Sequence, residues 1–217
     1  MITVIANLKG GSGKSTIAFN LAIWLLSKGE TVIAYDLDPQ KTLTDVALVR
    51  KDEGIKPDLQ VNDINGSNVA DELRSHFCHV LVDVGAANMD AMKAAISVAD
   101  RIIIPVPPSQ PDIWATQRFL KIIHDVCGAR IPDLITFINR ADTHHAIRES
   151  DEAEEALRML DRVDIMPGRL CQRTSYRRSL SEGLSVFELS NKSKSSEEFK
   201  LFADVLFPNL IEYQRGT

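Results

Sequence analysis

Several features that would assign a protein to a specialised class are missing from this sequence. No apolar run reaches the roughly eighteen residues that a membrane-spanning helix needs, so we expect no membrane span. We also expect no signal peptide, because the apolar residues 3–6 lead directly into a glycine-rich turn. Cysteine is scarce: Cys78, Cys127 and Cys171 are odd in number, widely spaced and outside any C-x-x-C motif. They predict free thiols in a reducing cytosol.

An excess of positive charge is missing as well. The chain carries 25 Lys and Arg against 30 Asp and Glu, a net charge of −5, so binding to nucleic acid would require a local basic patch. Repeats, low-complexity segments and an interdomain linker are not evident. The 217 residues are enough to bury a substantial core, and we expect a single domain over residues 1–217. We expect no N-terminal helix-turn-helix domain, because the first predicted strand begins at residue 2.

Short apolar segments alternate with longer helical patterns, which is typical of an α/β protein with a mainly parallel sheet. We predict a three-layer, mostly parallel, twisted sheet with helices on both faces, since the strand segments are almost continuously apolar. The predicted strands are Ile2–Ala6, Thr31–Tyr35, His79–Val82, Arg101–Val106, Asp133–Ile138 and Val163–Met166. The predicted helices are Ser15–Ser27, Thr42–Arg50, Asn68–Ser75, Met89–Ser97, Asp112–Val126, His145–Met159, Ser175–Ser181 and Ser196–Leu206.

The segment between the first strand and the first helix, NLKGGSGKST at residues 7–16, is similar to a phosphate-binding loop. The usual pattern is G-x-x-x-x-G-K-[ST], whose first glycine would stand at residue 8. This chain has Leu8 there, followed by Lys9, a lysine that the pattern does not require. A chance glycine-rich turn is the alternative, and the flanking strand and the complete GKST ending argue against it.

The chemistry of this segment suits a nucleoside triphosphate. Backbone N–H groups at the start of a helix converge on phosphate oxygens, and glycines permit the close approach. Lys14 would contact the β- and γ-phosphates, and the Ser15 hydroxyl would bind Mg²⁺. The predicted nucleotide-binding residues of the loop are Lys9, Gly10, Gly11, Ser12, Gly13, Lys14, Ser15 and Thr16.

Acidic residues follow two other predicted strands. Asp36 and Asp38 in YDLDPQ stand two residues apart, and Asp83 ends the apolar segment VLVD. Residues at the carboxyl ends of parallel strands face the ligand crevice, where carboxylates would hold water on Mg²⁺ or orient an attacking water. The alternative for YDLDPQ is an ordinary polar turn after a strand.

These elements together resemble the ParA/MinD family of deviant-Walker ATPases, and most of all its small, ParF-like plasmid partition members. The family motif K-G-G-x-G-K-[ST]-[ST] includes a signature lysine that corresponds to Lys9, and its D-x-D-P-Q element corresponds to residues 36–40. The segments PVPPS at 105–109, QRTSY at 172–176 and GLSVFE at 183–188 extend the resemblance from residue 1 to about 190. One departure is Val84-Gly85-Ala86 after Asp83, where many relatives have a proline pair.

The resemblance implies ATP and Mg²⁺ as ligands, a face-to-face homodimer that holds two nucleotides, and slow hydrolysis that a partner stimulates. Lys9 would reach the phosphates of the other subunit, Lys14 and Asp38 would complete the catalytic set, and Asp38 would position the water. Ser15, Asp36 and Asp83 would hold or surround the metal. Asn139 stands where relatives contact adenine, with Arg140 beside it; a solvated strand end is the alternative for this pair.

A local excess of positive charge occurs near the end of the chain. The family binds DNA without sequence preference through its C-terminal region, or in MinD binds a membrane, and a basic patch would give such salt-dependent DNA binding. The acidic residues of this region are Glu182 and Glu188. A solvated helix face is the alternative. The predicted DNA-binding residues are Arg169, Arg173, Arg177, Arg178, Lys192 and Lys194.

The resemblance favours a cytoplasmic, nucleoid-associated ATPase that segregates a plasmid or chromosome, or positions a protein assembly such as a carboxysome or chemoreceptor cluster. A ParB-like or adaptor protein would stimulate hydrolysis. A MinD-like membrane regulator is less favoured, because the last helix carries more acid than base and its apolar stripe (Phe199, Phe202, Val205, Leu206) is expected to pack on the domain. A metabolic or redox relative is the other alternative; iron–sulfur members need cysteines near Asp83, and the nearest is Cys78.

Overall fold

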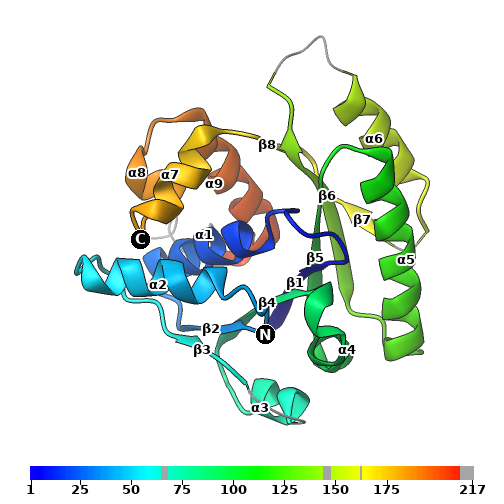
Figure 1. Cartoon of the computed structure of the whole chain (residues 1–217), viewed down its shortest axis with the longest axis horizontal. Coiled ribbons are helices and arrows are strands. Elements are labelled where there is room, and N and C mark those ends of the chain that lie inside the picture. Colours follow the sequence, from blue (N-terminus) through cyan, green and yellow to red (C-terminus); the bar gives the residue numbers. More distant parts are fainter. Residues whose placement is uncertain (65–67, 144–147, 162, 211–217) are drawn as a thin grey trace.

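The computed structural model describes residues 1–64, 68–143, 148–161 and 163–210. At its centre is an eight-stranded sheet in which all paired strands run parallel (Figure 1). The strand order is β3-β2-β4-β1-β5-β6-β7, and β8 also pairs with β6. The strands are β1 (Ile2–Asn7), β2 (Val32–Asp36), β3 (Val61–Asn62), β4 (His79–Gly85), β5 (Arg101–Val106), β6 (Asp133–Ala141), β7 (Asp164–Ile165) and β8 (Leu170–Cys171).

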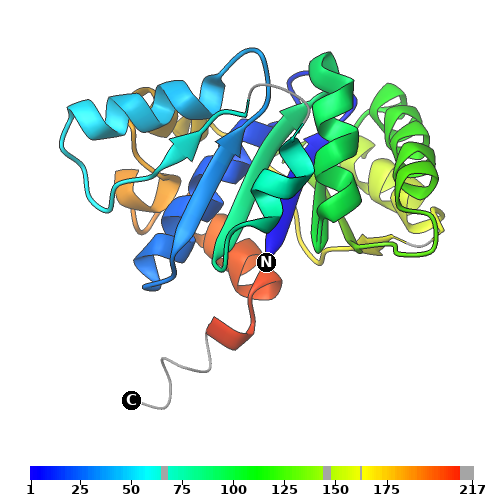
Figure 2. The same ribbon diagram turned by 90° about the horizontal axis from the view of Figure 1, so that it is seen from below.

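Helices cover both faces of the sheet, as the sequence predicted (Figure 2). One face packs against α1 (Lys14–Ser27), α2 (Thr42–Asp52), α7 (Thr174–Ser181), α8 (Val186–Leu189) and α9 (Lys194–Leu206). The other packs against α3 (Val69–Arg74), α4 (Met89–Val98), α5 (Gln110–Cys127) and α6 (Glu149–Arg158). A short 3-10 turn, η1 (Ala86–Asn88), follows β4.

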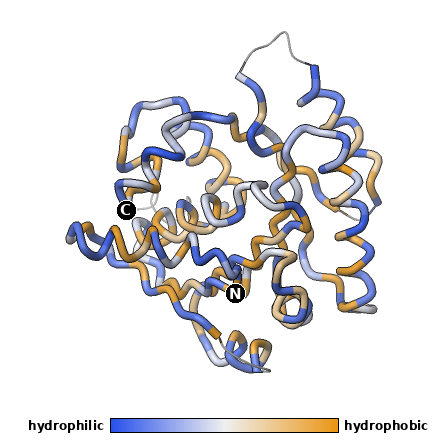
Figure 3. The backbone as a smooth tube through the Cα atoms, in the orientation of Figure 1, coloured by the Kyte–Doolittle hydropathy of each residue, from blue (hydrophilic) through white to orange (hydrophobic). Residues whose placement is uncertain are grey.

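Two hydrophobic cores result from the alternation of side chains along each strand. In β1, Val4 joins the core under α4 and α5, whereas Ile5 joins the core under α1 and α9. Ile102 and Ile103 of β5 divide in the same way. In Figure 3 the central strands are mainly hydrophobic, whereas the outer helices alternate between hydrophobic and hydrophilic stretches. The central strands are almost continuously apolar because both of their faces are buried under helices.

The predicted elements are all present, with ends that differ by a few residues, except that the predicted start of the sixth helix at His145 lies outside the described residues. The structure adds β3, β8, α8 and η1, which are too short to produce a periodic pattern. The three cysteines are free, as predicted. In α9, Phe199, Phe202 and Leu206 are buried as expected, but the prediction for Val205 was wrong, since it is 49% exposed. None of the described helices is long and apolar enough to cross a membrane.

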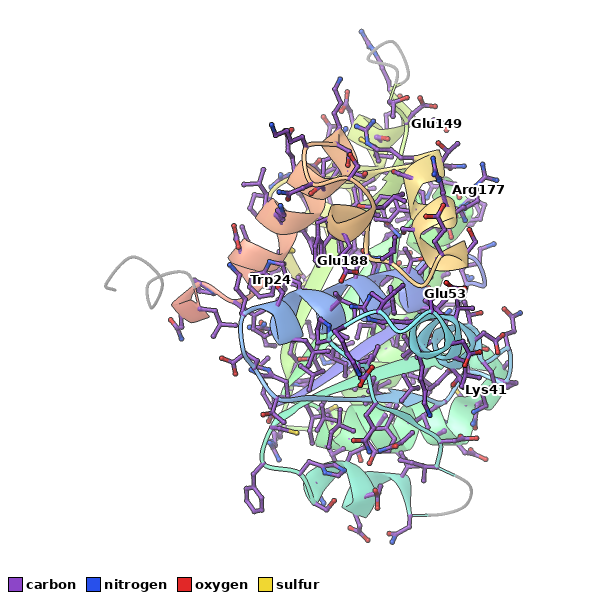
Figure 4. All side chains as sticks on the ribbon, turned by 90° about the vertical axis from the view of Figure 1, so that its left-hand side faces the viewer. Trp24, Lys41, Glu53, Glu149, Arg177 and Glu188 are labelled. Carbon is purple, nitrogen blue, oxygen red and sulfur yellow. The ribbon has the colours of Figure 1, made fainter. Side chains whose placement is uncertain are left out.

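A buried ion pair joins α2 to the C-terminal helices. Arg50 is fully buried, and its guanidinium donates two hydrogen bonds of 2.8 and 2.9 Å to the carboxylate of Glu188. Its remaining hydrogen bonds go to the carbonyl oxygens of Pro57 and Gly183. Gly183 has a φ of +65°, and a Cβ there would lie 2.6 Å from the backbone nitrogen of Arg50, so glycine is required. Glu188 (labelled in Figure 4) also accepts from the backbone of Ser185 and closes the capping box of α8.

A second buried contact joins the same region to α1. The side chain of Asn20 is fully buried; its Nδ2 donates to the carbonyl of Thr16, and its Oδ1 accepts from the backbone nitrogen of Val186 at 2.8 Å. The first helix after the glycine-rich loop is thereby fastened to the start of α8.

Replacing Glu188 by alanine should strongly destabilise the protein. The change leaves the guanidinium of Arg50 buried without its carboxylate, which costs about 3–5 kcal/mol of unfolding free energy. Urea unfolding would measure the loss. The matched control is Glu182→Ala, which removes the partner of the exposed Arg178 and should cost far less. Equal losses for the two variants would contradict a stabilising role for the buried pair.

Candidate nucleotide-binding site

A cavity of about 550 Å³ opens at the carboxyl edge of the sheet. This is the edge at which parallel α/β proteins bind ligands, and the volume suits a small molecule. Its floor is the glycine-rich loop between β1 and α1, and its walls come from the ends of β2, β4 and β6 and from α7. Of the residues predicted to bind a nucleotide or catalyse, those that line it are Gly10, Gly11, Gly13, Lys14, Ser15, Thr16, Asp38, Asn139 and Arg140.

The glycine-rich loop is held from both sides by side chains of the strands. Asn7 is fully buried; its Nδ2 donates to the carbonyl of Pro105 at 2.8 Å, and its Oδ1 accepts from the backbone nitrogen of Lys9. From β6, Asn139 donates to the carbonyl of Ser12 at 2.7 Å, and Arg140 donates to that of Gly11. These bonds hold the loop in shape without a ligand, because the carbonyls of Gly11 and Ser12 are already engaged.

Asn139 and Arg140 thus perform a task that the sequence did not reveal. A Cβ at residue 13 would lie 2.4 Å from Nδ2 of Asn139, and Gly13 has a φ of +94°, so only glycine fits between β6 and the loop. The adenine contact expected of this pair stays a prediction. The groups that the structure brings to the pair are backbone carbonyls of the loop, and Ser12 is 127 residues away from Asn139 in sequence.

Lys14 and Asp38 face each other across the cavity floor. Lys14 is 7% exposed, and its Nζ lies 4.0 Å from Oδ2 of Asp38. The other carboxylate oxygen of Asp38 accepts a hydrogen bond of 3.0 Å from the backbone nitrogen of Gln40. A cation and a carboxylate at this position suit a phosphate group and a water molecule respectively.

Lys9 differs from Lys14 in its surroundings. Lys9 is exposed and is not among the residues that line the cavity. Its backbone nitrogen donates a hydrogen bond to Oδ1 of Asn7. The two lysines of the loop therefore do not share one site within a single chain.

Asp36 is engaged by the protein itself. Its carboxylate is fully buried and accepts from the backbone nitrogen of Asp38 and from both the backbone nitrogen and the hydroxyl of Thr44. These bonds hold the turn that leads into α2 and satisfy a backbone N–H in the helix's first turn. These three hydrogen bonds give the carboxylate of Asp36 a structural role, and its expected place near the metal stays a prediction.

Asp83 is buried, with the Ser15 hydroxyl close enough to lower its pKa. Among the described residues, neither of its carboxylate oxygens has a hydrogen-bond partner. The pKa of Asp83 is raised to about 7: burial is the largest cause and the charges of Asp36 and Asp38 add to it, while the Ser15 hydroxyl and Lys14 act in the opposite direction. Asp36 and Asp83 are direct neighbours in the register of β2 and β4.

A divalent cation fits this arrangement at Asp83 and Ser15. Two buried carboxylate oxygens without partners are what a hard cation or its bound water would satisfy. The described residues contain no group of three or more His, Cys, Asp or Glu that could hold a metal by themselves. Mg²⁺ would therefore depend on the phosphates of the ligand as well as on the protein.

The wall formed by α7 and the two residues before it was not expected at this site. Gln172, Arg173, Thr174, Tyr176 and Arg177 all line the cavity. The sequence had assigned the two arginines to DNA, because the approach of residues 172–177 to the loop is a tertiary contact that no local pattern records. The hydroxyl of Tyr176 is buried and has no hydrogen-bond partner among the described residues, so a donor or acceptor is available to a ligand.

The six residues predicted to bind DNA divide into two groups. Arg169 pairs with Asp151 and Glu154 of α6, Arg178 with Glu182, and Arg173 with Glu198 of α9. The acidic partners from α6 and α9 lie outside the basic segment 169–194 in sequence. Counting charges within that segment therefore overstated its unpaired positive charge. Arg177 (Figure 4), Lys192 and Lys194 are exposed and have no ion-pair partner within the described ranges.

Comparison with known proteins gives a consistent set of relatives. The CobQ/CobB/MinD/ParA nucleotide binding domain matches residues 3–186. The chain is 26% identical over 227 residues to protein ParA of Rhizobium radiobacter, with 99% of each chain covered. It is 28% identical over 204 residues to maintenance of carboxysome distribution protein A of Halothiobacillus neapolitanus, covering 89% of this chain and 90% of that one. A solved ATP complex of the D38A variant of McdA from Cyanothece has a TM-score of 0.74 at 22% identity, covering 94% and 95% of the two chains.

The buried charge of Asp83 should make the ligand-free protein less stable at higher pH. The pKa is raised in the folded state, so the protonated carboxyl contributes to the stability of the fold. That stability is fully present below about pH 4 and is lost as the pH rises through 7. Asp83→Asn removes the titrating group. The unfolding free energy of the variant, compared with that of wild type, should rise by roughly 2 to 3 kcal/mol from pH 5 to pH 8, as measured by urea unfolding. Asp125→Asn, at an exposed carboxylate of α5, is the control. A gap between Asp83→Asn and wild type that does not change with pH would refute the assignment.

Proposed function

Because the chain belongs to the CobQ/CobB/MinD/ParA nucleotide-binding family, we propose that it is a ParA-like ATPase that partitions DNA or positions a protein cargo. The observation that carries this proposal is Lys9, a second lysine in the phosphate loop that is exposed and is not among the residues lining the cavity of its own chain. The similarity to a ParA protein and to a carboxysome distribution protein over almost the whole chain supports both kinds of cargo.

ATP would occupy the cavity with its phosphates on the backbone N–H groups of residues 10–16 and on Lys14. Ser15 and Asp83 would hold Mg²⁺, which supplies neutralisation of the phosphate charge when it is bound. Asp38 would orient the attacking water, since its carboxylate stands beside Lys14 at the end of the cavity that suits the terminal phosphate. The wall of α7 would cover the nucleoside.

Lys9 would act in a dimer. Its exposed ammonium would reach the phosphates in the cavity of a second copy, so each chain would complete the site of the other. Two like-charged nucleotides could face each other across such an interface only with added positive charge between them. ATP would thereby control assembly.

The ATP-bound dimer would bind DNA through its exposed cations, without sequence preference, and would associate with the nucleoid. A ParB-like or adaptor protein would stimulate the slow hydrolysis and release the dimer. A membrane surface is a less suitable track, since the apolar side chains Phe199, Phe202 and Leu206 of the last described helix are buried in the domain.

Lys9→Ala should bind ATP with nearly unchanged affinity but fail to dimerise. Removing Lys9 leaves the chain's own cavity intact and removes the charge that we assign to the second nucleotide. Calorimetry with a non-hydrolysable ATP analogue and light scattering measure the two properties. Lys14→Ala is the comparison variant and should lose binding itself. A full ATP-dependent dimer in Lys9→Ala would refute the proposed role.

DNA binding should require ATP and should weaken when the unpaired cations are removed. The double variant Lys192→Ala/Lys194→Ala should lower the slope of log K against log salt concentration by about 1 to 2, because two phosphate contacts are lost. Gel shifts of a random duplex at several salt concentrations measure it. Arg169→Ala is the control, since its guanidinium is already paired with two carboxylates. Equal binding by the double variant and wild type would exclude this surface.

A further inference from the structure

Gly85 ends β4 and lines the edge of the nucleotide cavity. Val84 and Gly85 continue the strand, and Gly85 pairs in register with Asn7 of β1. Its φ of −117° and ψ of 167° are those of an extended strand, which any residue adopts. The backbone therefore does not require glycine here.

The side chain of Asp38 does require it. A Cβ at residue 85 would lie 2.4 Å from Oδ2 of Asp38 and 3.4 Å from its Cγ. The same Cβ would lie 3.5 Å from Cε of Lys14, which is an ordinary contact. A methyl group at residue 85 thus conflicts with one atom group, the carboxylate that we place beside the attacking water.

Asp38 cannot move away without losing contacts. Its Oδ1 is held by the backbone nitrogen of Gln40, its own backbone nitrogen donates to Asp36 at 3.2 Å, and Oδ2 stands 4.0 Å from the ammonium of Lys14. A displaced carboxylate would break the bond to Gln40 or increase the distance from Lys14.

We propose that Gly85 is a positioning residue for ATP hydrolysis: the absence of a side chain there lets the carboxylate of Asp38 lie against the end of β4, next to Lys14. This proposal rests on the proposed function, in which Asp38 orients the water. Gly85 would act only through Asp38, and it would matter for turnover and not for the binding of ATP.

A double-mutant cycle tests this dependence. Gly85→Ala should lower the rate of single-turnover ATP hydrolysis roughly 10- to 100-fold, because the methyl group would displace the carboxylate of Asp38 by about 1 Å. The affinity for ATP should stay within about threefold of wild type. In the Asp38→Ala background the steric conflict is gone. There, Gly85→Ala should change neither turnover nor the denaturation midpoint, so the double variant should match Asp38→Ala.

The possible outcomes separate the positioning role from the proposed function. If Gly85→Ala hydrolyses ATP at the wild-type rate, or its effect adds fully to that of Asp38→Ala, the positioning role is overturned. If Asp38→Ala hydrolyses ATP normally, the assignment of Asp38 fails whatever Gly85 does. If Gly85→Ala does not fold but the double variant does, the conflict lies at Asp38 as proposed. Failure of both to fold places the conflict elsewhere and overturns the proposal.

Discussion

The register of the parallel strands at the carboxyl edge of the sheet is the constraint on which the cavity depends. The pairing of β1 with β4 sets Asn7 beside Gly85, and the pairing of β2 with β4 sets Asp36 beside Asp83. Since side chains alternate between the two faces, a slip of one residue would exchange the faces of Asp83 and Val84. One set of backbone hydrogen bonds therefore places the start of the phosphate loop, the carboxylate of Asp83 and the turn into α2.

Much of this arrangement could be predicted from the sequence, because the signals involved are local. The long strands and helices each carry their own hydrophobic pattern, and the phosphate loop lies within ten consecutive residues at 7–16. The parts that escaped prediction depend on the tertiary fold. Asn139 holds the loop across 127 residues of sequence, and the approach of α7 to the cavity is set by helix packing. The two-residue strands β3 and β8 are defined by their partners alone.

The distribution of charge shows the same limit. The basic segment near the end of the chain counts as positive by its composition, yet Arg169 and Arg173 are neutralised by carboxylates of α6 and α9. Asp36 and Asp83 are both aspartates at the ends of neighbouring strands, but Asp36 accepts three hydrogen bonds, whereas the carboxylate of Asp83 has no hydrogen-bond partner of normal geometry among the described residues. Whether a charged side chain can bind a ligand depends on the hydrogen bonds and ion pairs that it already makes with its neighbours in the fold.

The buried contacts of Asn20 and Arg50 make the last third of the chain a part of the nucleotide pocket. They fasten α1 and α2, which begin at the phosphate loop and just after Asp38, to the start of α8 and thereby to the α7 wall. A gene fragment cut after β6 would keep every nucleotide signature visible in its sequence and would lose this wall, together with the partners of two buried polar side chains. Surveys that count such fragments as working ATPases by their motifs would therefore overestimate their number.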